Sequence, residues 1–389
     1  MAAFIKSTFN AAAYLNHRVT YPTWVWDLVT RYHATGKIDP AASVTSASSG
    51  SPAASTLQPR ANVHFRKALD LGCGPGLSTL ALLPYFSEVL GIDPSPAMMK
   101  QALRDPQDAS LPPTLRFKPL DPASSHAVEL FGGREKIPTR LGQVDYLTDN
   151  AMDLKNYLGK YSSDATVPAE AQADLILAAQ SAHWFTPYSS FLPLMNRVLR
   201  PGGTLFFLGY SDFFLPDYPH LTSPLLKSYS KGKPPPHTDD GIGEFWEQPG
   251  RSIVVDGLTS IPFPWEAAAG CSGSSSESDL WDRSTAVRHV FSTRGRLPEH
   301  YSKHWAGTDD AASGLMLEKR VDWTQFAGYL STYSALHSYA AQNPSDGTQI
   351  AQRFVERVRA AIAQAEGTKS APETVLIRWP LHIYAVKKR

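Results

Sequence analysis

Apolar residues recur along the chain with two different spacings, and the alternation between them predicts a mixed α/β fold. Short apolar runs of strand length, such as Lys67 to Leu71 and Ala173 to Ala179, are separated by segments whose apolar residues return every three or four positions. Strands that alternate with helices in this way are typical of a parallel sheet with helices on both faces. We therefore expect a doubly wound core.

The first unit of this core is a strand, a glycine-rich turn, a helix and a second strand. The strand that begins at Lys67 stops at glycines, and a helix begins near Leu77. The next strand runs from Glu88 to Ile92 and is followed by a helix from Ala97 to Leu103. This order predicts a strand-turn-helix-strand unit, the usual start of a parallel sheet.

Two segments compete for the place of the third strand, Leu115 to Lys118 and Gln143 to Leu147. The pattern alone leaves both open. We favour the second, which makes Asp121 to Thr139 an insertion. Later, a helix that ends at Leu199 and a turn at Arg200 to Gly203 lead into a strand from Thr204 to Leu208.

Segments of different character flank this core. Helical spacing from Asn10 to His33 predicts two helices, with Pro22 in the first turn of the second. The Ala- and Ser-rich stretch from Pro40 to Pro59 predicts a flexible linker, and the region after Asp212 predicts a cap with helices at 322–341 and 350–365. Two last strands in 374–386, divided by Pro380, would complete the sheet. The predicted division is 1–39 helical lid, 40–60 linker, 61–212 core, 213–345 cap insertion, and 346–389 C-terminal helix and last core strands.

Composition and charge exclude several classes of partner. With 42% hydrophobic and 19% charged residues and a net charge of +1, the chain is typical of a globular protein without a basic surface for nucleic acid. No run of about 18 apolar residues and no charged leader before an apolar stretch is present, so we expect neither a membrane partner nor export, and a cytoplasmic location by default. Cys73 and Cys271 lie far apart, and we expect no disulfide.

The strongest candidate site is a glycine turn followed by an acid. Gly72, Gly74 and Gly76 follow an apolar strand and precede a helix, where backbone N–H groups can approach a ligand closely. Asp93 ends the next strand and is placed to accept hydrogen bonds from two ribose hydroxyls, while Asp70 could orient the amino group of a bound amino acid. This arrangement predicts a nucleotide-like cofactor.

A nicotinamide-dependent oxidoreductase is the first alternative, because it shares this topology and this acid. Its fingerprint needs a third glycine at position 77, where this chain has Leu77, and here the third glycine comes one residue early, at Gly76. The spacing therefore favours a different cofactor.

The same residues resemble the motifs of class I S-adenosylmethionine (SAM) dependent methyltransferases. The segments that carry this resemblance are Asp70 to Gly76, Asp93, Asn150 to Asp153, Ala173 to Phe185 and Leu199 to Gly203. More narrowly, the chain resembles the trans-aconitate methyltransferase-like group of small-molecule enzymes common in fungi. That likeness rests on Tyr14, Arg18, Tyr21-Pro22, Ala178 to Phe185 and Arg378 to Leu381.

The resemblance implies a Rossmann-like seven-stranded sheet with N-terminal helices and an inserted α/β cap, with SAM as cofactor and S-adenosylhomocysteine as product. It implies that the glycine turn meets the methionine part of SAM, that Asp93 holds the ribose, and that Asn150 and Ala151 meet the adenine. Tyr14 and Arg18 would close over the cofactor's carboxylate. The full set of implied cofactor positions is Tyr14, Arg18, Tyr21, Asp70, Gly72, Cys73, Gly74, Gly76, Asp93, Pro94, Met98, Asn150, Ala151, Met152, Gln180 and Ser181.

His183 is the candidate catalytic residue, because it follows a strand at its carboxyl end. It could take a proton from a thiol or hydroxyl or hydrogen-bond a substrate carboxylate, or it could only anchor the loop beside Trp184. Trp184 and Phe185 could form an apolar wall around the transferred methyl group, although aromatic packing under the cap is the favoured explanation.

The cap offers charged and aromatic residues without singling one out. Some of its arginines could clamp an acidic substrate; they are Arg283, Arg288, Arg294, Arg296 and Arg320. His289, His300 and His304 lack a spaced carboxylate or thiolate, so we expect no metal. Tyr329, Tyr333 and His337 fall on one face of a predicted helix, and packing against the core is the favoured interpretation.

These observations predict methyl transfer to a small molecule by a monomer or weak homodimer. The resemblance favours a carboxylate oxygen as the acceptor atom, with a thiol sulfur or hydroxyl oxygen as alternatives. A SAM-fold protein with a non-methylating role stays a further alternative.

Overall fold

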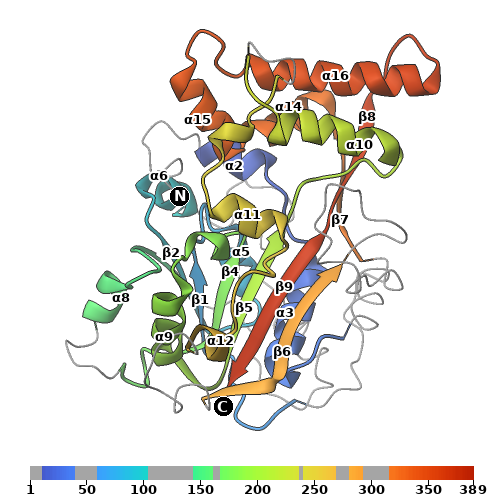
Figure 1. Ribbon diagram of the computed structural model, residues 1–389. Coiled ribbons are helices and arrows are strands. Elements are labelled where there is room, and N and C mark those ends of the chain that lie inside the picture. The colour runs from blue at the N-terminus through green and yellow to red at the C-terminus, as the bar shows by residue number, and fades with distance from the viewer. Residues whose placement is uncertain are drawn as a thin grey trace.

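A computed structural model describes residues 11–39, 59–103, 143–160, 167–235, 240–268, 280–291 and 315–389. Within these residues the chain forms a seven-stranded sheet in the order β3-β2-β1-β4-β5-β9-β6 and a separate pair, β7-β8 (Figure 1). The strands are β1 Lys67–Leu71, β2 Glu88–Asp93, β3 Gln143–Thr148, β4 Ala173–Ala179, β5 Leu199–Tyr210, β6 Trp281–Phe291, β7 Leu317–Asp322, β8 Thr374–Trp379 and β9 Leu381–Lys388.

Helices cover both faces and one end of the large sheet (Figure 1). They are α2 Ala11–His17, α3 Thr23–Thr35, α5 Leu77–Leu82, α6 Pro96–Ala102, α8 Lys155–Gly159, α9 Tyr188–Val198, α10 Pro219–Leu226, α11 Gly250–Val255, α12 Pro264–Ala268, α14 Trp323–Ser331, α15 Ser334–Gln342 and α16 Gln349–Glu366, with a short 3₁₀ turn, η2, at Ala182–Trp184.

The large sheet confirms the expected Rossmann-like α/β class. Strands β1 to β5 pair in parallel, and β9 runs antiparallel between β5 and β6. Gln143–Thr148 pairs with β2 as the third strand, as favoured from the sequence. The competing segment, Leu115 to Lys118, and the insertion at 121–139 lie outside the described residues, as does most of the 40–60 linker.

Alternation along the central strands divides the core between the two faces of the sheet. Leu175 and Leu177 of β4 pack into a cluster with α3 and α5, whereas Ile176 and Ala178 pack into a second cluster with α9. A strand points successive side chains to opposite faces, so a strand buried on both faces is apolar throughout. This explains why 173–179 is a continuous apolar run.

The N-terminal helices have two different positions. Every residue of α3 from Trp24 to Thr35 is buried, and the helix packs against the sheet beside β5. Only α2 lies over the pocket end, where it packs on α6 and α14. The range 1–39, expected to form one lid, therefore contributes one core helix and one helix of the lid layer.

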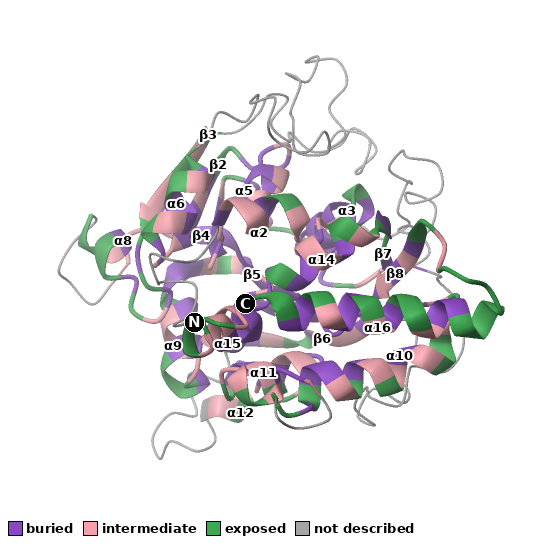
Figure 2. Ribbon diagram, turned by 90° about the horizontal axis from the view of Figure 1, so that it is seen from above, coloured by how far each residue is buried: buried purple, intermediate pink, exposed green. Residues whose placement is uncertain are grey.

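A cap layer, made of α10, α11, α14, α15 and α16, lies above the carboxyl ends of the parallel strands (Figure 1). Seen from above, α16 crosses this layer with buried residues on one side and exposed residues on the other (Figure 2). It packs on α10 and α14, so the helix expected to close the core is part of the cap.

The structure also corrects four expectations about strands, turns and helices. β6 lies inside the range assigned to the cap, yet it pairs with β9 at the edge of the main sheet, and β8 pairs with β7 instead of joining that sheet. The turn expected at Arg200 to Gly203 lies within β5 as an irregularity in its pairing with β4. The helix expected across Tyr329 and His337 is broken, because α14 ends at Ser331 and α15 begins at Ser334.

Candidate cofactor and substrate site

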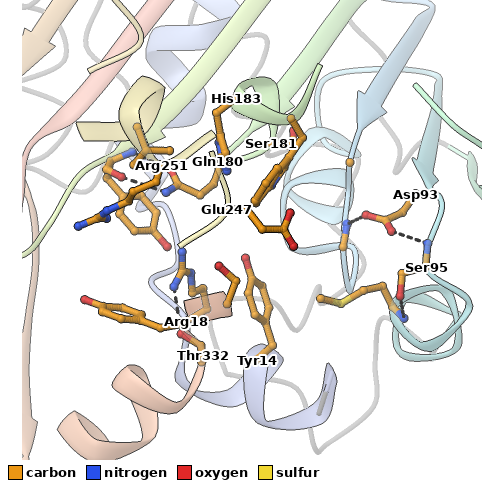
Figure 3. A pocket seen from close by; sticks show the side chains of 18 of the residues that line it. Tyr14, Arg18, Asp93, Ser95, Gln180, Ser181, His183, Glu247, Arg251 and Thr332 are labelled. Atoms are coloured by element: carbon orange, nitrogen blue, oxygen red, sulfur yellow. Dashed lines mark hydrogen bonds between the residues drawn. The ribbon is translucent and has the colours of Figure 1, made fainter. Parts of the chain in front are cut away.

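A cavity of about 1090 Å³, its opening included, lies between the carboxyl ends of the strands and the cap layer. Figure 3 shows side chains from the end of β2, the loop after β4, the N-terminal segment and the cap around it. The residues expected at the site that line this pocket are Tyr14, Arg18, Gly72, Gly74, Asp93, Pro94, Met98, Ala151, Gln180, Ser181, His183 and Trp184. Ligand sites of open α/β sheets lie at this end of the strands.

The glycine turn approaches the loop after β4 so closely that no side chain fits between them. Gly72 has φ of +66°, and a Cβ there would lie 2.5 Å from the Cβ of Ser181. Ser181 is held by a hydrogen bond of 2.6 Å from its Oγ to the carbonyl oxygen of Leu71. Gly72 is therefore required by both its backbone angle and the packing.

Asp93 organises the turn from the end of β2. Its Oδ2 accepts a hydrogen bond from the backbone N–H of Gly74 at 2.9 Å, and its Oδ1 accepts one from Ser95 at 2.8 Å (Figure 3). Burial raises the pKa of Asp93, while these two bonds favour its charged form. A carboxylate oxygen can accept a further bond, so Asp93 keeps capacity for a hydroxyl donor in the pocket.

Asp70 lies beneath the turn and does not line the pocket. Its Oδ2 accepts hydrogen bonds from Ser78 and Thr79 in the first turn of α5, at 2.6 and 2.7 Å. Its Oδ1 is buried and has no hydrogen-bond partner among the described residues. Burial raises the pKa of Asp70 to about 6, despite those two bonds.

Several expected contact residues support the pocket without lining it. They are Tyr21, Asp70, Cys73, Gly76, Asn150 and Met152. Gly76 is the N-cap of α5, where a Cβ would lie 2.4 Å from the hydroxyl of Tyr146. The Cys73 thiol is buried and free, and burial raises its pKa. The other cysteine lies outside the described residues.

The remaining residues that support the pocket without lining it lie in the loop after β3 and in the N-terminal segment. Asn150 accepts a hydrogen bond from the N–H of Met152 through its side chain, which leaves Ala151 between them as the one residue of this trio on the pocket wall. Tyr21 packs edge-on against Tyr210, with ring centroids 6.1 Å apart. The adenine contact expected of Asn150 stays a prediction.

Arg18 is a cation without an ion pair among the described residues. Its Nη1 donates a hydrogen bond of 3.0 Å to Thr332, while its Nε is buried without a partner. The rings of Tyr14, Tyr210 and Tyr329 surround its guanidinium, with centroids 5.3 to 5.9 Å away. Such a group favours an anion in the pocket.

Gln180 fixes the loop that carries His183. Its backbone has φ of +58°, and its side-chain amide exchanges two hydrogen bonds with the backbone of Tyr210, at 2.8 and 2.9 Å. Strained residues held by two bonds of this kind gather at functional sites. Both polar ends of Gln180 are engaged, so it shapes the wall of the pocket.

His183 is neutral at physiological pH. It is 8% exposed and lies against Trp184, with ring centroids 4.6 Å apart. Burial lowers its pKa to about 3, with smaller contributions from Arg18 and Arg251. An imidazole with this pKa is a weak base but can still exchange hydrogen bonds with a ligand.

Sequence reasoning missed or misinterpreted most of the cap side of the pocket. The lining residues outside the expected contact set are Ser95, Phe185, Tyr210, Ser211, Asp212, Trp246, Glu247, Arg251, Val254, Tyr329, Thr332, Tyr333 and Ser334. Tyr329 and Tyr333, interpreted as helix packing, face the pocket as well as each other. The position of Tyr210 to Asp212 just after a strand was a usable signal.

Three of the arginines expected to clamp a substrate have described positions, and these three lie away from the pocket. Arg283, Arg288 and Arg320 do not line the pocket, and Arg288 instead pairs with Glu266 at 3.0 Å. Arg294 and Arg296 lie outside the described residues, as do His300 and His304. Among the residues with described positions, no cluster of three metal-ligating side chains occurs, and no helix is long and apolar enough to cross a bilayer.

A parallel sheet with a glycine turn after β1 and an acid at the end of β2, both lining one pocket, defines a Rossmann-like domain that binds a nucleoside-containing cofactor. Comparison with known proteins gives the particular class. Residues 69–205 match the model of a methyltransferase domain. This chain is a SAM-dependent methyltransferase, with SAM as its cofactor.

Individual relatives resemble different shares of the chain. A probable S-adenosylmethionine-dependent methyltransferase of Saccharomyces cerevisiae, CRG1, is 21% identical over 389 residues, which cover 100% of this chain and 98% of that protein. A trans-aconitate 2-methyltransferase of Methylobacterium radiotolerans is 28% identical over 142 residues, 36% of each chain. The solved structure of a proposed type II methyltransferase from Anaeromyxobacter dehalogenans covers 95% of this chain and 97% of its own, with 20% identity and a TM-score of 0.48.

Proposed function

We propose that this enzyme methylates a carboxylate oxygen of a small molecule, using SAM held in the half of the pocket that the glycine turn builds. In this proposal Asp93 binds the ribose, Arg18 and Tyr14 meet the cofactor's carboxylate, and Asp70 supports the glycine turn from beneath. Cap residues then enclose the acceptor.

One observation carries the cofactor half of the proposal. Arg18 lines the pocket, has no ion pair among the described residues, and has a buried Nε without a hydrogen-bond partner among them. Leaving such a group unsatisfied is costly, so a bound anion that pairs with its guanidinium gains the difference. The carboxylate at the amino acid end of SAM matches this group.

Bound SAM supplies an electrophilic methyl group on a sulfonium. The chain's own residues then contribute mainly position, and holding two reactants in line is worth effective molarities of about 10⁵ M or more. Trp184 and the tyrosine rings of the cap exclude water from the pocket wall. Gln180 and Ser181 fix the loop after β4 that faces the turn.

The state of His183 supports a carboxylate as the acceptor. A carboxylate is already deprotonated near neutral pH, so it needs no base, whereas a hydroxyl does. With a pKa near 3, His183 is suited to donate a hydrogen bond to an acceptor oxygen and is a poor proton acceptor. The resemblance to the trans-aconitate group and the name of the Methylobacterium relative agree with this preference.

The test is to identify the product. Purified enzyme is incubated with isotopically methyl-labelled SAM and a panel of small carboxylic acids, thiols and phenols, and labelled products are separated by mass spectrometry. We expect labelled methyl esters that release methanol on mild base hydrolysis. Label found only in thioethers or aryl ethers would contradict carboxylate methylation and leave methyl transfer standing.

One observation favours a second candidate, a hydroxyl or thiol acceptor. The Glu247 side chain lines the same pocket from the cap and points into it (Figure 3). A carboxylate in that position could take a proton from the acceptor. If so, Glu247→Gln should lower kcat by about 10²-fold or more and remove the dependence of kcat on an acidic group. For a carboxylate acceptor we expect kcat to fall less than 10-fold.

A further inference from the structure

The end of the pocket farthest from Asp93 contains an ion pair between Arg251 and Asp212. Figure 3 shows Arg251 of α11 and Asp93 at opposite ends of the cavity. Arg251 is 12% exposed, lines the pocket, and did not figure among the residues expected from the sequence. A ligand that reaches from the glycine turn to the cap would end beside it.

Arg251 is held in place on two sides. A single nitrogen, Nη2, donates to both carboxylate oxygens of Asp212, at 2.8 and 2.7 Å. The guanidinium also lies over the ring of Trp246, 4.1 Å from its centroid. An arginine fixed by a carboxylate and an aromatic face loses little conformational entropy when it binds a ligand.

The remaining donors of Arg251 have no assigned acceptor. A guanidinium carries five N–H bonds, two of them on Nη2. Apart from a long contact of 3.5 Å between Nη2 and Ser230 Oγ, no other hydrogen bond joins Arg251 to a described side chain, so Nε and Nη1 keep three N–H donors. Oxygens of a carboxylate are the acceptors that this planar group binds best.

We propose that Arg251 is a specificity-determining residue. It binds a second carboxylate of the acceptor, remote from the oxygen that is methylated, and this role rests on the proposed methyl transfer. Asp212 and Trp246 position Arg251 for this contact. The preferred acceptor is then a small molecule with at least two acidic groups. Because the contact is far from the reacting atoms, it lowers KM and changes kcat little.

Binding of defined acids tests the proposal directly. Wild-type protein is saturated with S-adenosylhomocysteine, so no turnover occurs, and is titrated by calorimetry with trans-aconitate and with phthalate. We expect at least one of these acids to bind and the uncharged methyl ester of that acid to bind at least 10-fold more weakly.

The variants must separate recognition from folding. Arg251→Leu alone removes the ion pair of the buried Asp212 carboxylate, so the double variant Asp212→Asn/Arg251→Leu is measured beside it. Both should bind the acid about 10- to 100-fold more weakly than wild type and S-adenosylhomocysteine with unchanged affinity. Arg251→Lys should recover only part of the loss, because an ammonium lacks the planar array of donors.

Arg288→Leu is the matched control. Arg288 also forms an ion pair, with Glu266 at 3.0 Å, and also lies 4.1 Å from an aromatic centroid, that of Phe263, but it does not line the pocket. The Arg288→Leu variant should bind the acids with the same affinity as the wild type. Equal acid affinity in wild type and the double variant, or no acid binding to a wild type that binds S-adenosylhomocysteine, would overturn the role of Arg251. Failure to bind S-adenosylhomocysteine would instead refute the cofactor half of the proposed function.

Discussion

The two ends of the pocket are built in different ways. At the glycine-turn end, Gly72 and Asp93 belong to one continuous strand-turn-helix-strand unit. Within it, the N–H of Gly72 donates to the carbonyl oxygen of Ile92 at 2.7 Å, and the N–H of Gly74 donates to Asp93 Oδ2 at 2.9 Å. At the cap end, Asp212 follows β5, Arg251 lies in α11, and Tyr329 lies in α14. These residues meet only through side-chain contacts across long sequence separations.

This difference separates a rigid end of the pocket from an adjustable one. Backbone donors and left-handed glycines leave little freedom at the turn end, so the cofactor position is rigid. Side chains on a separate layer can change without disturbing the sheet, so the cap end is suited to determine which acceptor binds. Three predictions test this division, beginning with the largest expected effect.

The rigid end should not tolerate a methyl group at Gly72. Gly72→Ala adds a Cβ 2.5 Å from that of Ser181 at a φ of +66°, so we expect the free energy of unfolding to fall by about 2–4 kcal/mol, measured by chemical denaturation. Gly367→Ala is the control, since Gly367 has φ of +67° but no atom within 4 Å, and it should cost only about 1–2 kcal/mol. An equal fall in the free energy of unfolding for both variants would mean that the close approach of Gly72 to Ser181 adds nothing to the cost of the substitution.

Among the strand-end carboxylates, only Asp93 should affect the cofactor. Asp93→Asn should weaken SAM binding by about 10-fold or more, measured by calorimetry, because a charged acceptor for ribose hydroxyls is lost. Asp149, at the end of β3, likewise accepts backbone hydrogen bonds, from Asn150 and Tyr157 at 2.9 and 2.8 Å, but does not line the pocket. If Asp149→Asn weakened SAM binding as much, the effect of Asp93 would be one of folding.

The smallest expected effect concerns pH and His183, which lies where the two ends meet. Burial lowers its pKa to about 3, against 6.5 for an ordinary histidine, so between these values the unfolded state binds more protons and stability falls as the pH falls. From pH 7.5 to 5, His183→Gln should therefore lose about 1–2 kcal/mol less stability than wild type.

Exposed His220 provides the control for this measurement. His220→Gln should follow the wild-type pH curve in the same denaturation series. A His183→Gln curve parallel to wild type would contradict the burial argument and restore His183 as a candidate proton acceptor.

Sequence patterns predicted the parts of the fold that depend on local order. Short apolar runs in the sequence located β1, β2 and β4 to within a residue, because a strand buried on both faces needs a continuous apolar run. The sequence did not predict that β6 belongs to the main sheet, since the polar and apolar residues of an edge strand resemble those of a loop or cap strand. The same limit applies to β8, whose partner β7 lies far away in the chain.

The sequence by itself determined the glycine turn and the acid at the end of β2, because both belong to one strand-turn-helix-strand unit that local order specifies. Only the tertiary structure decided which cap residues reach the pocket. Trp246 lies near Arg251 in the chain, but Asp212, which forms the ion pair with Arg251, lies 39 residues earlier. Contacts of this kind depend on how whole layers pack, which local spacing does not encode.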